Sequence, residues 1–345
     1  MTLASMKRKT EARPVTPKAK RQATSAMIAS LAAEGYDTVA APFGHALVDL
    51  ARMNDRIIGL SADLSKYTDL HVFAQAMPDR FYQMGMAEQV LISAAAGLAR
   101  EGFIPFATTY AVFASRRAYD FIAMAIAEEN LPVKIVCALP GLTTGYGPSH
   151  QATEDLAIFR GLPNVTIVDP CDADDITGMV PAIAAHDGPV YARLLRGKVP
   201  SVLTRHKPDY RFELGRAQVI REGTDALVIS SGFMTMRALD AAERLEADGV
   251  SVAVLHVPTI KPLDTETILA EARRDGRLVV TAENHTEVGG LGEAVARTLL
   301  TNGVAPTFRM IALPDAFLEA GALPTLHEMY GLSVGKVAER VRGWL

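Results

Sequence analysis

From residue 36 to residue 200, short runs of β-branched and apolar residues alternate with longer Ala-rich segments. Strands that are buried on both faces read as continuous apolar runs, and helices between them indicate parallel crossover connections. The pattern therefore predicts an α/β domain, a doubly wound parallel sheet with helices on both faces. The expected strands are 56–62, 103–109, 133–139, 165–169 and 190–195, and the expected helices are 86–101, 111–129 and 172–186.

The alternation stops after residue 200 and then resumes. Pro, Lys, Arg and Gly interrupt the periodicity of the following stretch, so we interpret 201–222 as a linker between domains. A second and smaller α/β domain is expected over 223–345. Its predicted strands are 226–232, 251–257, 277–283 and 307–313, with helices such as 236–249 between them.

Length and composition fit this two-domain plan. The chain has 345 residues, of which 49% are hydrophobic and 21% charged, with a formal net charge of −4. A single core rarely grows beyond about 250–300 residues, and this charge gives no general attraction to nucleic acid or anionic membranes. No stretch is apolar for the about 18 residues that a membrane span needs. The two cysteines, Cys137 and Cys171, form neither a disulfide framework nor a metal-binding spacing.

The first 37 residues form a basic tail that we place outside both domains. The stretch MKRKTEARPVTPKAKRQ contains seven Lys or Arg residues and one Glu. A nucleic-acid-binding arm is one interpretation, and a flexible or partner-clasping tail is the favoured one. Because the tail lacks the apolar segment of a secretory signal, we expect a cytoplasmic protein with no nucleic-acid or membrane partner.

Glu88 stands out in the segment FYQMGMAEQVLISAAAGLAR (81–100). A carboxylate in the first turn of a helix can simply be stabilised by the helix dipole. However, the residues around Glu88 are almost all small or apolar, which leaves little solvated face. A buried carboxylate needs a partner or must hold its proton, so Glu88 is a candidate functional acid.

Two further segments follow predicted strands of the first domain. Tyr110 and Phe113 are three residues apart, so we expect them to share a helix face. They can be core residues, or they can offer a flat surface on which a heteroaromatic ring stacks. The loop GLTTGYGPSHQATEDL (141–156) is rich in Gly and ends in His150 before a helix start. His150 is either a helix-capping or surface histidine, or a functional residue that acts as a general acid/base or as an oxyanion donor.

Several familiar catalytic motifs are absent from the sequence. It contains no G-x-S-x-G, no G-x-x-x-x-G-K-[ST], no H-E-x-x-H and no G-x-G-x-x-G that opens a helix after a strand. The stretch GGLGEAVAR (289–297) places glycines at a helix start. Such glycines can bind an anion on free backbone N–H groups or can form a tight strand-to-helix turn.

Taken together and in this order, the motifs resemble the second half of the transketolase family of thiamine diphosphate enzymes. The segments SADL, RFYQMGMAEQ, PFATTYAVFASRRAYDF and GYGPSHQATEDLAIFRGLPNVTIVDPCDADD are similar to its pyrimidine-binding domain. The segment AENHTEVGGLGEAVA is similar to its C-terminal domain. The resemblance covers residues 40 to 340 approximately.

The resemblance implies roles for individual residues. Glu88 matches the acid that hydrogen-bonds N1′ of the aminopyrimidine and so promotes loss of the thiazolium C2 proton. Phe113, with Tyr110 beside it, matches the aromatic residue that stacks on the pyrimidine. His150 matches a histidine that faces the substrate, and Asp63 matches an acid near the cofactor. Arg196 falls where the family holds a substrate phosphate, which suits a guanidinium.

The family's diphosphate-binding motif is missing. Its members bind diphosphate and Mg²⁺ through G-D-G and a later Asn on a separate domain, and no G-D-G occurs in this sequence. We therefore expect a C-terminal subunit of a split transketolase. The expected partner is an N-terminal subunit that carries G-D-G and holds Mg²⁺, in an α2β2 assembly that is active only when both subunits are present.

The substrate is less defined by the sequence. In ordinary transketolases the substrate loop contains an Asp where GYGPSHQ has Tyr146, so the ketose donor can differ from the usual pentose phosphates. Transfer of a two-carbon ketol unit to an aldose is the favoured activity. The alternatives are the β subunit of a 2-oxo acid dehydrogenase, a deoxyxylulose phosphate synthase-like enzyme, and a non-catalytic scaffold for a partner subunit.

Overall fold

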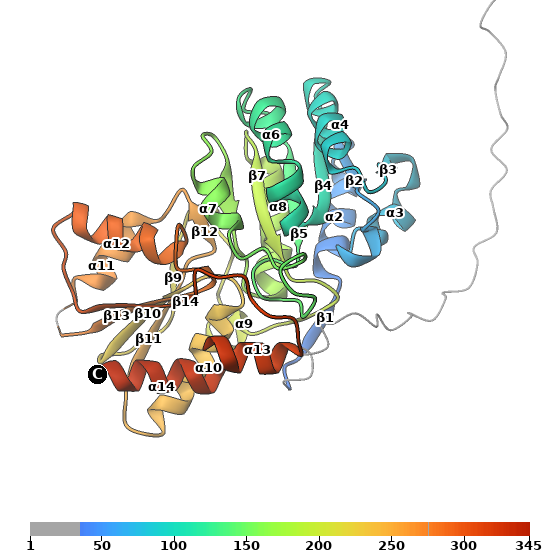
Figure 1. Ribbon diagram of the computed structural model, residues 1–345. Coiled ribbons are helices and arrows are strands. Elements are labelled where there is room, and N and C mark those ends of the chain that lie inside the picture. The colour runs from blue at the N-terminus through green and yellow to red at the C-terminus, as the bar shows by residue number, and fades with distance from the viewer. Residues whose placement is uncertain (1–34, 275) are drawn as a thin grey trace, which may run out of the picture.

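The computed structural model describes residues 35–274 and 276–345, which form two α/β units that lie side by side (Figure 1). The predicted basic tail therefore lies outside the described residues, except for its last three positions. The first unit occupies the upper right of Figure 1, and the second unit occupies the lower left, with the C-terminus at its outer end.

The first sheet has seven strands in the order β12-β6-β7-β5-β4-β2-β3. All neighbouring pairs are parallel except β12 with β6. The sheet is thus a doubly wound parallel sheet with one antiparallel edge strand, as such folds commonly have. Its strands are β2 (Ile57–Ser61), β3 (Phe81–Gln83), β4 (Ile104–Tyr110), β5 (Lys134–Ala138), β6 (Thr166–Val168), β7 (Val190–Leu194) and β12 (Thr259–Lys261).

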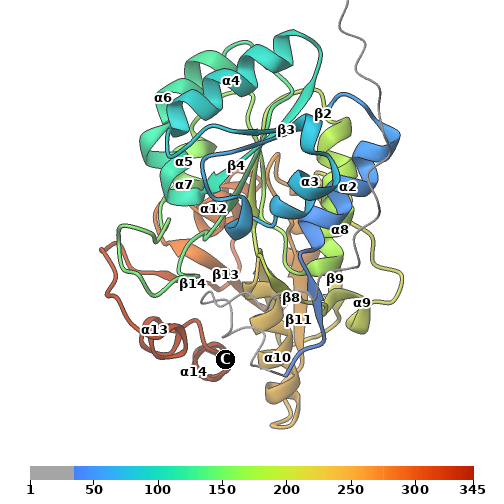
Figure 2. The same cartoon turned by 90° about the vertical axis from the view of Figure 1, so that its right-hand side faces the viewer.

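Helices cover both faces of the first sheet, and Figure 2 shows the two layers with the sheet between them. One layer consists of α4 (Glu88–Arg100), α5 (Ala111–Arg117), α6 (Tyr119–Ile122), a π-helical turn (Ala123–Ala127) and α7 (Asp155–Arg160). The other layer consists of α2 (Pro42–Met53), α3 (His71–Ala76) and α8 (Ala173–Ala185). Short 3₁₀ turns at Ser65–Tyr67 and Pro78–Arg80 connect β2, α3 and β3.

The second sheet has five strands in the order β14-β13-β10-β11-β9, of which only β9 is antiparallel to its neighbour. Its strands are β9 (Gln218–Arg221), β10 (Ala226–Ser230), β11 (Val252–His256), β13 (Leu278–Thr286) and β14 (Phe308–Leu313). Its helices are α10 (Met234–Glu246), α11 (Thr265–Ala272), α12 (Leu291–Thr301), α13 (Leu323–Tyr330) and α14 (Val334–Trp344). A two-stranded pair, β1 (Thr38–Ala40) with β8 (Lys198–Pro200), and the short helix α9 (Leu203–His206) complete the structure.

Two hydrophobic cores run through both units, one on each side of the sheets. One core joins α2 and α8 to α10 and α14, with members such as Phe43, Ile176 and Val337. The other core joins α4 to α11 and α12, with members such as Leu91 and Val295. Because each core contains residues of both units, the two sheets share their packing.

The structure confirms the predicted fold class and places a strand in each segment predicted to form one. The predicted helix 111–129 is broken, since α5 ends at Arg117 and a π-helical turn follows α6. The domain boundaries stay a prediction. Within the predicted linker, β9 pairs with β11, and β12 of the predicted second domain pairs with β6 of the first. No helix in the described residues is long and apolar enough to cross a membrane.

Candidate active site

The candidate residues gather where β2, β3 and β4 end. Ser61 lies in register with Gln83 and Thr108, so the carboxyl ends of these three parallel strands meet at one edge of the sheet. Ligands of open α/β sheets bind at this edge. Asp63 and Glu88 follow β2 and β3 in the chain, and Tyr110 is the last residue of β4.

Glu88 is the first residue of α4 and is 2% exposed. The hydroxyl of Thr109 donates to Oε1 of Glu88 at 3.3 Å. Nη1 of Arg117 lies 3.5 Å from Oε2, and the Arg117 side chain is itself 51% exposed. The carboxylate is therefore buried at the helix start, with one hydroxyl donor and one guanidinium beside it. A hydrogen bond gains strength in such a low-dielectric setting.

Three rings meet beside this carboxylate. The centroid of Phe113 lies 5.7 Å from that of Tyr110 and 5.5 Å from that of His150, whose ring stands edge-on to it. The guanidinium carbon of Arg117 lies 3.9 Å from the Phe113 centroid. Our expectation that Tyr110 shares a helix face with Phe113 is wrong, because Tyr110 belongs to β4 and α5 begins at Ala111. The two rings nevertheless lie close together, because the chain turns from strand into helix between them.

The loop that carries His150 is held by the second unit. The carbonyl of Gly145 accepts from the backbone N–H of Gly321 at 3.0 Å, and an added Cβ at Gly145 would meet the Gly321 oxygen at 1.9 Å. The side-chain amide of Gln151 donates to the carbonyl of Glu319 at 3.1 Å. This close approach explains why the loop is rich in glycine. His150 is thus positioned by contacts from both units.

His150 itself is half-buried, with Nδ1 2.9 Å from the hydroxyl of Ser149. Burial, and secondarily the positive charge of Arg117, lower the pKa of His150 below its usual 6.5. A neutral imidazole can accept a proton or donate one hydrogen bond, which is the behaviour required of a general base. The ring centroid of Tyr146 lies 5.3 Å from that of His150, so the exposed Tyr146 covers its outer side.

Arg196 lies at the same edge and is 5% exposed. Its guanidinium carbon lies 5.6 Å from the ring centroid of Tyr67. The nearby ionisable groups of Tyr110, Asp69 and Tyr146 favour the charged form of the guanidinium. Burial lowers the pKa of Arg196. Its Nε has no hydrogen-bond partner among the described residues. A buried guanidinium with an unused donor can bind an anionic group of a ligand.

Asp63 is exposed and lies to one side of this cluster. It has a positive φ of 59°, and its backbone N–H donates to Oε1 of Gln83 at 2.6 Å. Within the described part of the chain, no hydrogen bond, ion pair or ring contact joins Asp63 to Glu88 or Phe113. Asp63 lies beside the cluster and is hydrogen-bonded to Gln83. The structure therefore brings together the other six predicted site residues, which are Glu88, Phe113, Tyr110, His150, Tyr146 and Arg196.

Sequence reasoning missed two arginines of α5. Arg117 lies between Glu88 and Phe113, and its spacing of four residues from Phe113 is the signal that could have revealed it. Arg116 binds Glu154 and donates to the carbonyls of Pro148 at 2.8 Å and Gln151 at 3.3 Å. Arg116 therefore fastens the His150 loop to the helix that carries Phe113.

The glycine-rich start of α12 is occupied by the chain's own carboxylate. Glu283 accepts from the backbone N–H groups of Leu291 at 2.6 Å and Gly292 at 2.7 Å. An added Cβ at Gly290 would meet Oε2 of Glu283 at 2.0 Å. The turn interpretation of this motif is therefore the one that the structure supports, and the helix N-terminus holds the chain's own carboxyl group.

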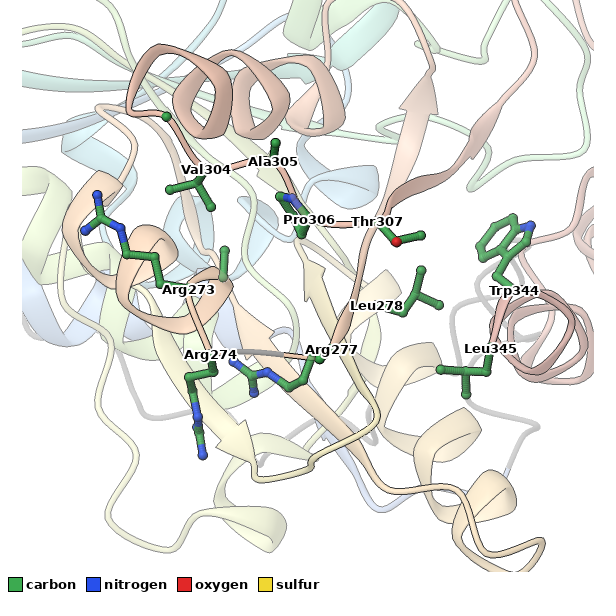
Figure 3. A pocket seen from close by; sticks show the side chains of 13 residues that line it. Arg273, Arg274, Arg277, Leu278, Val304, Ala305, Pro306, Thr307, Trp344 and Leu345 are labelled. Atoms are coloured by element: carbon green, nitrogen blue, oxygen red, sulfur yellow. The ribbon is translucent and has the colours of Figure 1, made fainter.

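A cavity of about 560 Å³ lies in the second unit, and none of its lining residues belongs to the Glu88 cluster. Figure 3 shows Arg273, Arg274 and Arg277 on one side of it and Trp344 on the other. Arg274 and Arg277 are already paired with Glu271. The Glu88 cluster, which combines a buried acid with aromatic rings and a loop histidine, is therefore the candidate site. Among the described residues, no group of three or more His, Cys, Asp or Glu could hold a metal ion.

At the carboxyl edge of this parallel sheet, the buried acid can accept a hydrogen bond and the aromatic ring can stack on a flat heterocycle. Residues 36–201 match the transketolase pyrimidine-binding domain, and residues 215–337 match the transketolase C-terminal domain. The chain belongs to the transketolase family, whose members depend on thiamine diphosphate.

Related proteins support the same assignment. A transketolase family protein of Sinorhizobium fredii is 69% identical over 326 residues, which are 94% of each chain. A 6-deoxy-6-sulfo-D-fructose transketolase subunit of Clostridium sp. is 41% identical over 84% of this chain and 89% of its own. A solved structure of a split gene transketolase, described as an inactive beta4 tetramer, is 43% identical with a TM-score of 0.80 and covers 88% of this chain and 97% of its own.

A longer relative matches over only part of its length. The 1-deoxy-D-xylulose-5-phosphate synthase of Syntrophotalea carbinolica is 35% identical over 88% of this chain, and the match spans 47% of that enzyme. The present chain thus corresponds to about half of that single-chain relative and to nearly all of the split transketolase chain.

Proposed function

We propose that this chain is the pyrimidine-binding subunit of a two-subunit transketolase, a transferase that moves a two-carbon ketol unit from a ketose to an aldose. One observation carries the proposal: a buried carboxylate, Glu88, faces an aromatic platform, Phe113, across a space that a flat N–H donor fits. The guanidinium of Arg117 lies in that space, 3.5 Å from the carboxylate and 3.9 Å from the ring centroid. An aminopyrimidine has the same flat shape and polar edge.

The residues of the site suit thiamine diphosphate, which supplies a carbon acid that becomes a carbonyl nucleophile. Glu88 would hold the proton at N1′ of the pyrimidine, and its burial strengthens that hydrogen bond. Phe113 would support the face of the pyrimidine, with Tyr110 behind it. His150 would hydrogen-bond the oxygen of the reacting substrate, where its lowered pKa keeps it neutral and able to take a proton. Asp63 would have a supporting role through Gln83.

The substrate we propose is a sugar with an anionic end. Arg196 is buried, its Nε donor has no partner within residues 35–274 and 276–345, and the rings of Tyr110 and Tyr146 lie in its neighbourhood. A guanidinium recognises the tetrahedral oxygens of a phosphate or a sulfonate. The Clostridium relative is a subunit that acts on 6-deoxy-6-sulfo-D-fructose, which shows that a close relative takes a sulfonated ketose. Tyr146 would contact the donor in place of the family's Asp.

The partner we propose is an N-terminal transketolase subunit that carries the G-D-G motif and holds the diphosphate and Mg²⁺. An α2β2 assembly in the cytoplasm is the expected form. The similarity to a split gene transketolase chain, over 97% of that chain, supports this arrangement.

Reconstitution tests the proposal. The chain is mixed with an N-terminal transketolase subunit that carries the G-D-G motif, thiamine diphosphate and Mg²⁺, and ketol transfer is measured from phosphorylated and sulfonated ketoses to an aldose phosphate. We expect turnover from the mixture and none from either subunit alone. Robust turnover by this chain alone with cofactor and Mg²⁺ would refute the split arrangement.

A second candidate is a deoxyxylulose phosphate synthase-like activity, which the 35% identity to the Syntrophotalea enzyme favours. The β subunit of a 2-oxo acid dehydrogenase is related to it, because both reactions begin with a 2-oxo acid. The same reconstituted complex is assayed with pyruvate. Consumption of pyruvate without any ketol transfer would establish the second candidate in place of the first.

A further inference from the structure

Arg117 makes two contacts that a bound pyrimidine would also make. Its guanidinium lies 3.9 Å above the ring centroid of Phe113 and, at the same time, 3.5 Å from the Glu88 carboxylate. A guanidinium is planar, donates N–H bonds in its plane and stacks on aromatic faces. It is therefore the side chain that most closely resembles a protonated aminopyrimidine in shape and donor pattern.

The two contacts cannot both persist when a pyrimidine binds. A heterocycle that stacks on this face of Phe113 and donates to Glu88 needs the volume in which the guanidinium lies. Arg117 can leave that volume, because it is the last residue of α5 and its side chain is 51% exposed. Its neighbour Arg116 is fixed to Glu154 and the His150 loop instead, so a change at Arg117 need not disturb that loop.

Burial of Glu88 gives a reason for such an arrangement. The carboxylate is 2% exposed, and its other partner is the neutral hydroxyl of Thr109. An isolated buried charge is costly, and a nearby cation removes much of that cost. In the cofactor-free chain, the described residues supply that cation through Arg117 alone, by the contact at 3.5 Å.

We propose that Arg117 is a placeholder: in the cofactor-free chain its guanidinium occupies the pyrimidine position between Glu88 and Phe113, and it swings out to solvent when the cofactor binds. This inference rests on the proposed function. It adds that the Arg117 guanidinium competes with the pyrimidine for the same position. Cofactor affinity is then reduced by the fraction of molecules in which the placeholder is seated.

The first test concerns the cofactor-free chain and needs no activity. The side-chain Nε–Hε signal of Arg117 is identified in an NMR spectrum by its loss in Arg117→Lys. We expect this signal to be shifted upfield by the ring of Phe113 and to return to an ordinary position in Phe113→Leu. A signal that does not respond to Phe113→Leu would show that the guanidinium is not seated, and it would overturn the proposal.

The second test measures cofactor affinity. Thiamine diphosphate is titrated calorimetrically, with saturating Mg²⁺, into the reconstituted complex of both subunits. Arg117→Ala is expected to lower Kd about three- to tenfold, because the half-exposed Arg117 no longer competes through its ion pair and its cation–aromatic contact. Arg117→Lys, which keeps the charge but not the planar fork, should lie between the wild type and Arg117→Ala.

Arg100→Ala is the matched control. Arg100 is also the last residue of a helix, its side chain is 53% exposed, and it pairs with Glu129. Its Kd should equal that of the wild type. An unchanged or weaker affinity for Arg117→Ala would overturn the placeholder and leave the proposed function intact. A wild-type complex that binds no thiamine diphosphate would overturn the proposed function and the placeholder together.

Discussion

Glu88 is a carboxylate that is almost completely removed from water, and its surroundings are a hydroxyl, a guanidinium and an aromatic ring. Removing a carboxylate from water costs folding free energy, and one ion pair with a half-exposed arginine offsets only part of that cost. A chain that keeps it at this position is using it for something other than stability. Substitution of Glu88 should therefore affect activity strongly and stability only slightly.

We expect Glu88→Gln to lower kcat of the reconstituted enzyme by at least about 100-fold, since general acid–base roles contribute about 10²–10⁴-fold. The free energy of unfolding should fall by less than about 1 kcal/mol, or rise, because a buried charge is removed. Steady-state kinetics and urea unfolding measure the two effects. Glu101→Gln, an exposed acid just after α4, is the control and should change neither. Full activity of Glu88→Gln would instead favour a scaffold role.

Asp69 is a second buried acid near the site. Its Oδ1 and Oδ2 accept from the backbone N–H of Gly197 at 3.1 and 2.9 Å, beside Arg196. Burial raises the pKa of Asp69 to about 7, although the Gly197 hydrogen bond and the Arg196 charge oppose this. Its charge therefore changes near neutral pH, next to the arginine that we propose binds the substrate anion.

This shift predicts a pH-dependent stability. The folded-state pKa of Asp69, about 7, lies above its ordinary 3.8, so its contribution to stability is complete below about pH 4 and is lost as the pH rises through 7. The difference in unfolding free energy between wild type and Asp69→Asn should thus fall from pH 4 to pH 8, by up to about 4 kcal/mol. Urea unfolding across this range measures it. A difference that is independent of pH, or that grows towards pH 8, would contradict the prediction.

At the scale of elements, the N-terminus of α12 shows how the second unit uses a buried acid for structure. Glu283 is fully buried and accepts two backbone N–H groups of the first turn. These N–H groups have no partner within the helix, because the first four N–H groups of an α-helix never do. The side chain that satisfies them comes from β13, so it also fixes the helix to the sheet.

We expect Glu283→Ala to lower the free energy of unfolding by about 2–4 kcal/mol, because two buried donors lose their acceptor. Glu293→Ala is the matched control. Glu293 is exposed in the first turn of the same helix and accepts from the N–H of Gly289, so its loss should cost less than about 1 kcal/mol. Urea unfolding compares them. Equal losses would indicate that burial of the acceptor is unimportant here.

The central strands could be predicted from the sequence, even the three-residue β6, whereas the short edge strands and the helix α2 (Pro42–Met53) were not predicted. The central strands are continuous apolar runs, so their pattern identifies them without tertiary information. The strands Thr259–Lys261 and Gln218–Arg221 are short and exist because a neighbour pairs with them. For the site, Glu88 was visible as a charge in an apolar helix, and His150 as a histidine in a glycine-rich loop. Arg117 was missed because a half-exposed arginine reads as ordinary surface, although its spacing of four residues from Phe113 was a usable signal.

At the scale of the whole molecule, the two units behave as one body in their packing. Both hydrophobic cores contain residues of both sheets. The buried Arg193 pairs with Asp155 and Asp169 of the first unit and donates to the carbonyl of Asn284 at 3.2 Å in the second. The side chain of Asn284 in turn binds the backbone at Leu142 and Pro140. Neither unit can loosen without exposing these groups.

We therefore expect cooperative unfolding in a single transition. The sequence contains one tryptophan, Trp344, which lies in α14 of the second unit, so its fluorescence reports on that unit alone. Far-UV circular dichroism reports on both. In urea, the two signals of the isolated chain should give the same midpoint. A fluorescence transition that precedes the dichroism transition would show that the units unfold separately.

The antiparallel edge strand β12 has a consequence for protein solubility. Thr259 and Lys261 pair with Val168 and Ile167, so a segment that comes late in the chain closes one side of a sheet that is otherwise complete by residue 194. During synthesis, the backbone donors and acceptors along the edge of β6 stay unpaired until β12 has been made. Such an open strand edge is a template for intermolecular association. A fragment that ends after residue 201 lacks β12, so the edge of β6 would stay unpaired. We expect this fragment to precipitate under conditions in which the full chain remains in solution.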